Sequence, residues 1–184
     1  MTAEILEQFQ LASDSFENLV AGVRPDQLAI QTPCPEWSAQ ELINHAVKGN
    51  LMFTRLFTGA EPPAVDAVGD PAAAISGSTK ALREAASAEG ALGSTFNTPM
   101  GERTGGRLMA IRVLELSVHG WDLAQATGQS FELPEPIIET CFAVLRATLP
   151  ENRDGLPYGA EQQAGPEASA TERLVAFAGR TVTA

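Results

Sequence analysis

The sequence is poor in cysteine, in aromatic residues and in basic residues. Two of its 184 residues are cysteines, 6% are aromatic, and 12 Lys and Arg stand against 23 Asp and Glu. Cys34 and Cys141 lie far apart and form no CxxC pair, which argues against a disulfide framework and a thiolate zinc site. The formal charge of −11 repels phosphate backbones and anionic lipids, so we expect neither nucleic acid nor membrane as a partner.

Long hydrophobic runs are also missing. No apolar segment approaches the roughly 18 residues that a membrane helix needs, and residues 1–4 lack the basic character of a secretory signal. We therefore expect a cytoplasmic protein. With 44% hydrophobic and 19% charged residues, the chain has the composition of a folded globular protein. Its length predicts a single domain over residues 1–184.

Apolar residues recur along most of the sequence at the three- and four-residue spacing that is typical of helices. Ser38 followed by Glu41 predicts a capping box, and Gly128 predicts the end of a long helix. No strand pattern is strong enough to build a sheet, although the glycine-rich connection 90–106 has room for a short extended piece at 95–97. Amphipathic helices bury their stripes most simply against each other, which predicts an all-α four-helix bundle with a short additional C-terminal helix. We expect helices over about residues 2–23, 38–57, 71–88, 107–127, 136–149 and 171–179.

Three ionisable side chains fall within the apolar stripe of the predicted helix 107–127. At 100° per residue, Glu115, His119 and Asp122 share a sector of roughly 60°, with apolar residues on both sides. A carboxylate in an apolar face costs several kcal/mol unless it is paired, protonated or bound to a cation. A bound metal ion is one way to stabilise these buried carboxylates.

The spacing of these side chains favours a chelating site. Glu115 and His119 are four residues apart, so they project from consecutive turns and can bind one ion. The other histidine is His45, in the second predicted helix. If the second and fourth helices are neighbours, His45, Glu115 and His119 form a set with an open position, as in catalytic zinc sites. Asp122 is better placed to accept a hydrogen bond from a ligating histidine, or from a metal-bound water, than to be a fourth ligand.

Imidazole and carboxylate ligands suit Zn²⁺, and Ni²⁺, Fe²⁺ or Mn²⁺ would also be accepted. With one anionic ligand the ion keeps a net positive charge, enough to deprotonate bound water or a thiol near neutral pH.

The candidate ligands on each of the two helices also have an interpretation without a metal. His45 alone can be a core or surface histidine, and Glu115 with His119 can be a pair on a solvent face. Cys34 either packs or reaches the site, and the sequence leaves this open.

Several segments resemble the DinB-like metal-binding superfamily. They are residues 32–38, Thr-Pro-Cys-Pro-Glu-Trp-Ser, residues 42–45, Leu-Ile-Asn-His, and residues 115–124, Glu-Leu-Ser-Val-His-Gly-Trp-Asp-Leu-Ala. Within the superfamily, the chain is similar to the group related to the N-terminal domain of mycothiol-dependent maleylpyruvate isomerase. Residues 168–180 resemble the ending of that group.

The resemblance implies a DinB-like bundle that holds a divalent metal, usually zinc, through His45, Glu115 and His119, with Asp122 close to the site. Better-known members use the metal to activate a low-molecular-weight thiol such as mycothiol or bacillithiol. We therefore hypothesise a thiol-dependent transferase or isomerase that presents the thiolate to a small electrophilic substrate. A non-catalytic metal-binding or sensor module, and a metal-dependent hydrolase with Asp122 as base, are alternatives, so the sequence leaves open whether the chain is an enzyme. Bundles of this type can also form a homodimer.

Overall fold

The computed structural model describes residues 2–62, 64, 66–98, 101–150, 152–153 and 158–182. This part of the chain is mostly helical and carries one small sheet. Its elements are α1 (Thr2–Ala21), the 3-10 turn η1 (Pro25–Gln27), α2 (Ala39–Thr58), α3 (Pro71–Ala86), β1 (Thr95–Thr98), β2 (Gly101–Thr104), α4 (Gly105–Thr127), α5 (Glu135–Thr148) and α6 (Ala170–Phe177).

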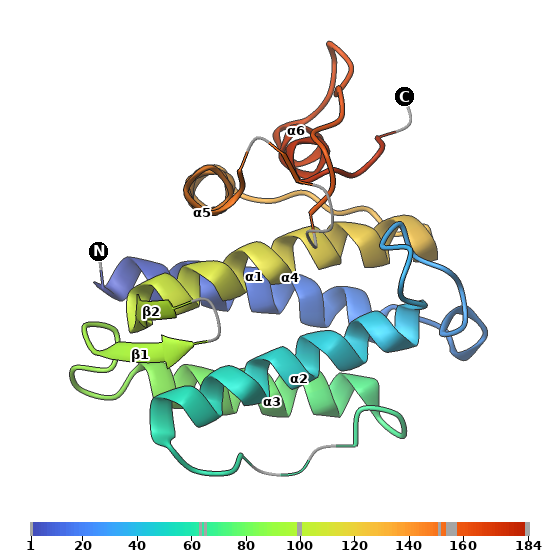
Figure 1. Cartoon of the computed structure of the whole chain (residues 1–184). Helices are drawn as coiled ribbons and strands as arrows, with labels where there is room; N and C mark the ends of the chain where they lie inside the picture. The colour runs from blue at the N-terminus through green and yellow to red at the C-terminus, as the bar shows by residue number, and fades with distance from the viewer. Residues whose placement is uncertain are drawn as a thin grey trace.

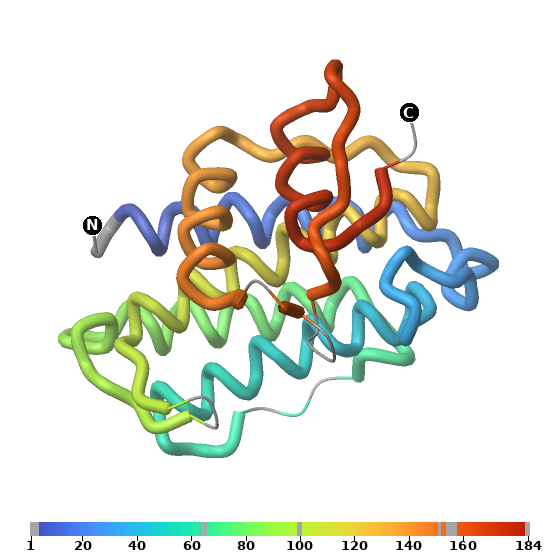
Figure 2. The backbone as a smooth tube through the Cα atoms, turned by 45° about the horizontal axis from the view of Figure 1, so that its top comes forward, coloured from blue at the N-terminus to red at the C-terminus, as the bar shows by residue number. Residues whose placement is uncertain are grey.

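The four longest helices run side by side in two layers (Figure 1). Both α1 and α2 pack against α3 and against α4, so each helix of the four has two neighbours in the group. α5 packs on α4, and α6 packs on α5. These two helices lie across the outside of the four and are seen end-on in Figure 1, whereas Figure 2 shows them from the side.

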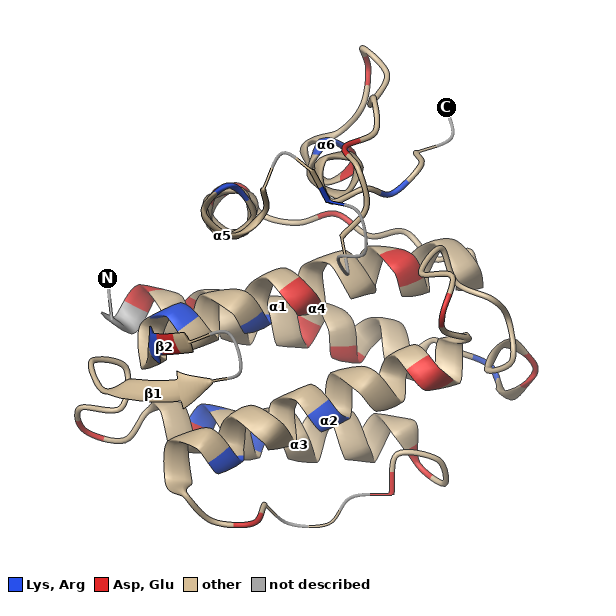
Figure 3. Ribbon diagram, in the orientation of Figure 1, with Lys and Arg blue, Asp and Glu red and all other residues tan. Residues whose placement is uncertain are grey.

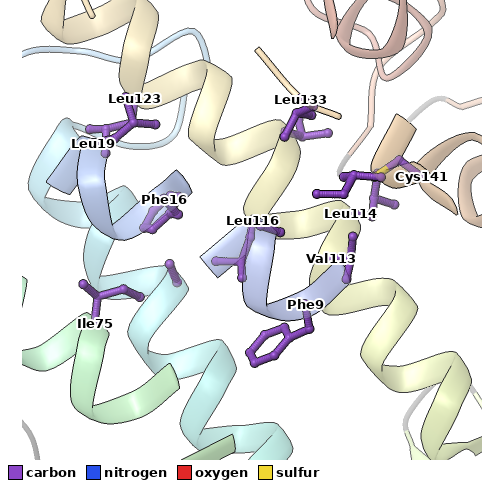
Figure 4. Close-up of a cluster of buried hydrophobic side chains, with 14 of the residues drawn as sticks. Phe9, Phe16, Leu19, Ile75, Val113, Leu114, Leu116, Leu123, Leu133 and Cys141 are labelled. Atoms are coloured by element: carbon purple, nitrogen blue, oxygen red, sulfur yellow. The ribbon is translucent and has the colours of Figure 1, made fainter. Parts of the chain in front are cut away.

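The interior of the four helices is filled by the apolar side chains whose spacing predicted those helices. Phe9 and Phe16 of α1 and Ile75 and Leu82 of α3 are at most 1% exposed, and Figure 4 shows part of this core. Burial of such stripes, rather than intrinsic propensity, supplies most of the stability of helices in proteins. The apolar faces of these two helices therefore lie in the interior of the four, as expected for amphipathic helices.

The helix ends that position the site also follow the sequence. The Ser38 amide donates to Glu41 Oε2 at 2.8 Å, and the Glu41 amide donates to Ser38 Oγ at 3.4 Å, which is the predicted capping box at the start of α2. Gly128 ends α4 with φ at 71°, the left-handed conformation that favours glycine. The first of these ends fixes where α2 begins, about two turns before His45.

The prediction that the chain would form no sheet was wrong. β1 and β2 form an antiparallel hairpin in the register Thr95↔Thr104 to Thr98↔Gly101. Both strands are short and largely exposed, so they show none of the apolar alternation by which a half-buried strand is recognised. Phe96 packs against the core and anchors the hairpin to the helices. The hairpin leads directly into α4 and lies away from the histidines.

Acidic and basic positions are interspersed over helices and loops (Figure 3). No helix within the described ranges is long and apolar enough to cross a membrane. Two arginines depart from the surface pattern, because Arg112 is 0% and Arg180 is 6% exposed. Arginine is almost never buried to this degree unless it is paired. The partners of these two side chains therefore show where buried charges lie in the molecule.

Candidate functional site

The two histidines of the chain lie side by side although they come from different helices. His45 is on α2 and His119 is on α4, and their ring centroids are 5.2 Å apart with the ring planes at 81°. Trp37 stacks on His45 at 4.1 Å between centroids and meets His119 at 5.3 Å in an edge arrangement. The predicted site required the helices that carry the two histidines to be neighbours, and α2 does pack against α4.

The three predicted ligands, His45, Glu115 and His119, line one cavity of about 550 Å³. Its walls come from α2, α4, α5, the loop before α2, and the chain near Tyr158 and Arg180. Most of the surface of the wall is apolar, and the polar groups on it include the side chains of the two histidines, Glu115, Tyr158 and Arg180. A concave apolar cavity with a few convergent polar groups is the usual form of a small-molecule site.

Asp122 is fully buried beside His119, and both of its carboxylate oxygens are bonded. Oδ2 lies 3.1 Å from His119 Nδ1, and Arg180 donates from Nε to Oδ1 at 2.9 Å and from Nη2 to Oδ2 at 2.8 Å. Burial raises the pKa of Asp122, but the hydrogen bonds from His119 and Arg180 outweigh it and hold that pKa below its usual value. The carboxylate can only accept, so the contact selects the neutral tautomer in which Nδ1 of His119 carries the proton and Nε2 has the lone pair.

Glu115 lies at the edge of the cavity with 28% of its side chain exposed, and its Oε2 accepts a hydrogen bond from Arg112 Nη1, one turn earlier on α4. Its expected place within a buried stripe was therefore only partly right. Arg112 neutralises the charge of Glu115 in an ion pair, just as Arg180 neutralises that of Asp122. A metal ion is therefore not needed to explain why either carboxylate lies at or inside this part of the protein. The case for a metal rests on the two histidines and the cavity.

The environment of His45 favours the form of imidazole that binds metals. Burial, followed by the proximity of His119, lowers the pKa of His45 to about 4. At neutral pH the ring is therefore uncharged and has a lone pair to offer, whereas a protonated ring could not be a ligand.

A second set of donor atoms shares the site. Among the described residues, the ligand atoms of Cys34, His119 and Asp122 all lie within 4.8 Å of one another, and this is the one set of three that does. Burial raises the pKa of the Cys34 thiol even though Arg180 lowers it, so this sulfur is a protonated thiol at neutral pH. A cation here would also have to displace Arg180 from Asp122. The loss of the Arg180 pair disfavours this set as a metal site, although Cys34 does line the cavity.

Three residues around the site were given no role in the sequence analysis. Arg112 stands inside an apolar run of α4, which is itself a signal for a buried and paired arginine. Arg180 comes from beyond α6, and no spacing rule relates it to Asp122. Tyr158 lines the cavity, and burial raises the pKa of its hydroxyl group above the usual value.

The family model of the mycothiol maleylpyruvate isomerase N-terminal domain matches residues 9–124. The chain belongs to this family. The match includes all four predicted site residues and Arg112, whereas Arg180 lies outside it. The uncharacterized proteins MT0763 and Rv0738 of Mycobacterium tuberculosis are each 38% identical to the chain over 180 residues, which covers 94% of this chain and 96% of theirs. No solved structure matches the chain.

Proposed function

We propose that the chain binds one divalent metal ion, with zinc as the preferred metal, through His45, Glu115 and His119. We further propose that it uses the ion to activate mycothiol or a similar low-molecular-weight thiol for transfer to, or isomerisation of, a small electrophile. In this proposal α1 to α4 are the DinB-like four-helix bundle of the family. The observation that carries it is the pair of imidazoles, 5.2 Å apart on the wall of one cavity.

The donor groups suit such an ion. His45 is uncharged at neutral pH because its pKa is lowered to about 4, and His119 has its Nδ1 proton fixed by Asp122. Glu115 supplies one negative charge after its carboxylate turns from Arg112 toward the cavity. Three ligands of this kind leave one coordination position for a thiol.

When bound, the ion supplies a positive charge that lowers the pKa of a coordinated thiol, so that thiolate forms near neutral pH. The residues of the chain do the rest. Asp122 and Arg180 hold the tautomer and the orientation of His119 through hydrogen bonds, and such partners typically change metal affinity or activity by about 10-fold to 100-fold. Asp122 is therefore assigned a positioning role, acting through His119.

The walls of the cavity suit a small organic electrophile next to the thiol. Leu114 of α4 and Val144 and Leu145 of α5 provide apolar contact and exclude water. The hydroxyl group of Tyr158 stays protonated because burial raises its pKa, so it is a hydrogen-bond donor on this wall. Exclusion of water favours attack by the thiolate over hydrolysis of the electrophile.

The proposal is tested by following conjugation of mycothiol with a fluorogenic alkyl halide. In this reaction the sulfur forms a bond to carbon, halide leaves, and the thiol proton passes to solvent. We expect zinc-loaded protein to accelerate the reaction, and expect no acceleration from chelator-treated protein or from His119→Ala. If zinc is bound at one ion per chain and neither conjugation of this halide nor isomerisation of a maleyl substrate is accelerated, the thiol chemistry is rejected, and the chain is a metal-binding module without this activity.

A further inference from the structure

Arg112 of α4 is buried in a cradle formed by one stripe of α2. Its Nε and Nη2 donate to Asn50 Oδ1 at 3.2 and 2.9 Å, and its Nη2 also donates to the carbonyl oxygen of Ala46 at 3.2 Å. The ring of Phe53 lies 5.8 Å from Cζ, in a cation–π arrangement. Ala46, Asn50 and Phe53 lie on one face of α2, at the spacing of successive helical turns. The guanidinium is therefore held by the helix that carries His45.

The same stripe contains a glycine that makes room for the guanidinium. A Cβ atom added to Gly49 would lie 2.5 Å from Arg112 Nη1 and 3.0 Å from Cζ. Asn50 is also fixed from its other side, because its Nδ2 donates to Ser78 Oγ at 3.2 Å and to Thr79 Oγ1 at 3.3 Å, both on α3. These bonds leave the Asn50 oxygen facing Arg112, so the cradle is built from two helices and does not depend on Glu115.

Glu115 is the one charged partner of Arg112 among the residues that the structure describes. The other partners, Asn50 Oδ1 and the Ala46 carbonyl, are neutral acceptors. Glu115 is also the partner that reaches solvent and the cavity, whereas the cradle is buried. If the carboxylate leaves, Arg112 keeps three hydrogen bonds and its position.

We propose that Arg112 is a positioning residue that competes with the metal ion for Glu115. This inference rests on the proposed function. In the metal-free protein, the guanidinium holds the carboxylate at the cavity edge and balances its charge, so the fold is complete without metal. When an ion enters between the histidines, Glu115 turns to it and Arg112 stays in its cradle on α2. The competition lowers the affinity for the metal and makes its uptake reversible.

The most direct test is the substitution Asn50→Asp, which places a carboxylate next to Arg112 inside the cradle. Asn50→Asp has nearly the same shape and keeps the acceptor atom that faces Arg112, and the hydroxyl groups of Ser78 and Thr79, which accept from Asn50 Nδ2, have to donate to the new oxygen instead. Arg112 is then satisfied, and Glu115 is released to the metal. We expect zinc to bind about tenfold more tightly, since hydrogen bonds to charged groups are worth roughly one to two powers of ten in an equilibrium constant. The measurement is a competition titration of the metal-free protein with Zn²⁺ and a chromophoric chelator.

Asn44→Asp is the matched control for the added charge. Asn44 is also on α2 and adjoins His45, but its side chain contacts Gln40 rather than Arg112. We expect this variant to stay within about twofold of the parent in zinc affinity, because an exposed or half-exposed charge is screened by solvent. A tenfold gain in both variants would mean that general electrostatics is responsible, and would overturn the competition.

Arg112→Met supplies a readout that separates competition from a purely structural role. We expect the metal-free variant to melt at a lower temperature, yet to bind zinc more tightly than the parent because the competing cation is gone. A structural role alone predicts that both properties become worse. If Arg112→Met does not fold, Asn50→Asp decides, since it retains the guanidinium and its shape.

The two proposals fail in distinguishable ways. If the parent binds zinc and neither Asn50→Asp nor Arg112→Met binds it more tightly, the competition is overturned while the metal site stands. If the parent takes up no zinc at all, the proposed function fails, and the competition fails with it.

Discussion

Two carboxylates of α4, Glu115 and Asp122, lie two helical turns apart, and each is paired with a buried arginine in a different way. The partner of Glu115 is Arg112, one turn away on the same helix, and 28% of the glutamate side chain is exposed. The partner of Asp122 is Arg180, 58 residues further along the chain, and the aspartate side chain is 0% exposed. Glu115 itself lines the cavity, whereas Asp122 does not line it and contacts two residues that do, His119 and Arg180.

The difference in burial determines what each carboxylate can do. Asp122 accepts two hydrogen bonds from Arg180 and one from His119, so releasing it would leave a buried charge without a partner. Glu115 can change partners at a lower cost than Asp122, because solvent reaches it and its buried arginine keeps three hydrogen bonds to neutral acceptors. A fixed carboxylate suits the orientation of a histidine, whereas an exchangeable one suits a ligand.

The largest effect that this comparison predicts is for Arg180→Met. It removes both Arg180 hydrogen bonds from the buried Asp122 and leaves the one from His119, so we expect a loss of about 3 to 5 kcal/mol in the free energy of unfolding. Urea denaturation of the metal-free protein measures it. Arg180→Lys keeps the charge and should lose less. A loss below about 1 kcal/mol for the methionine variant would show that the Asp122 pair is not the fixed one.

A smaller effect is expected for Gly49→Ala, which probes the cradle of Arg112. The new Cβ would meet the guanidinium at 2.5 Å, and overpacking of this kind costs about 1 to 3 kcal/mol, against a helix-propensity gain of about 1 kcal/mol. We expect a net destabilisation that shrinks in an Arg112→Met background, where the flexible thioether can move aside. Gly49→Ala would contradict the cradle if it stabilised the parent by the full propensity gain.

The pH dependence of stability separates His45 from the Asp122 pair. The folded state keeps His45 unprotonated down to about pH 4, whereas the unfolded chain takes up that proton near pH 6.5. The unfolded state thus binds more protons between these values, so stability falls as the pH is lowered from 6.5 to 4, by about 1 to 2 kcal/mol after solvent screening. The pKa of Asp122 is lowered from 3.8, so that carboxylate contributes to the slope only below about pH 5, at the acid end of this window. Denaturation of the metal-free protein at several pH values should show this slope, and an unchanged slope in His45→Gln would refute its assignment.

The smallest effect on stability is expected for Glu115→Gln. Because the side chain is half-buried and Arg112 retains its neutral acceptors, we expect a loss of at most about 1 kcal/mol, less than for Asp122→Asn. Zinc affinity should nevertheless fall, since the only anionic ligand is removed. Calorimetric unfolding of both variants, with and without zinc, makes this comparison. Equal stability losses in the two variants would erase the distinction between the pairs.

The helices could be predicted from the sequence because they follow from local periodicity, whereas the meeting of the two histidines could be predicted only on the condition that α2 and α4 are neighbours. The apolar stripes of α1 and α3, the capping box at Ser38 and the glycine stop at Gly128 depend on residues close in the chain. His45 and His119 fall on stripes of two helices, so packing of those helices was enough to bring them together. The metal itself stays a prediction.

The arginine partners could not be predicted in the same way. Arg180 reaches Asp122 through the path of the chain after α6, which no helical period encodes. Periodicity also assigned Glu115 to a buried stripe, because a helical wheel cannot show that this stretch of α4 faces a cavity rather than packed side chains. β1 coincides with the extended piece expected at 95–97, but its pairing with β2 was not predicted, because Phe96 is the one large apolar side chain in the two strands.

The central claim is that His45, Glu115 and His119, rather than Cys34, His119 and Asp122, hold a metal ion. The most direct test is the zinc content and zinc affinity of the parent, of His45→Ala and of Cys34→Ser, measured by elemental analysis and chelator competition. The account predicts one zinc per parent chain, unchanged binding in Cys34→Ser, and a loss of about tenfold or more in His45→Ala. Zinc that is lost in Cys34→Ser and kept in His45→Ala would contradict it.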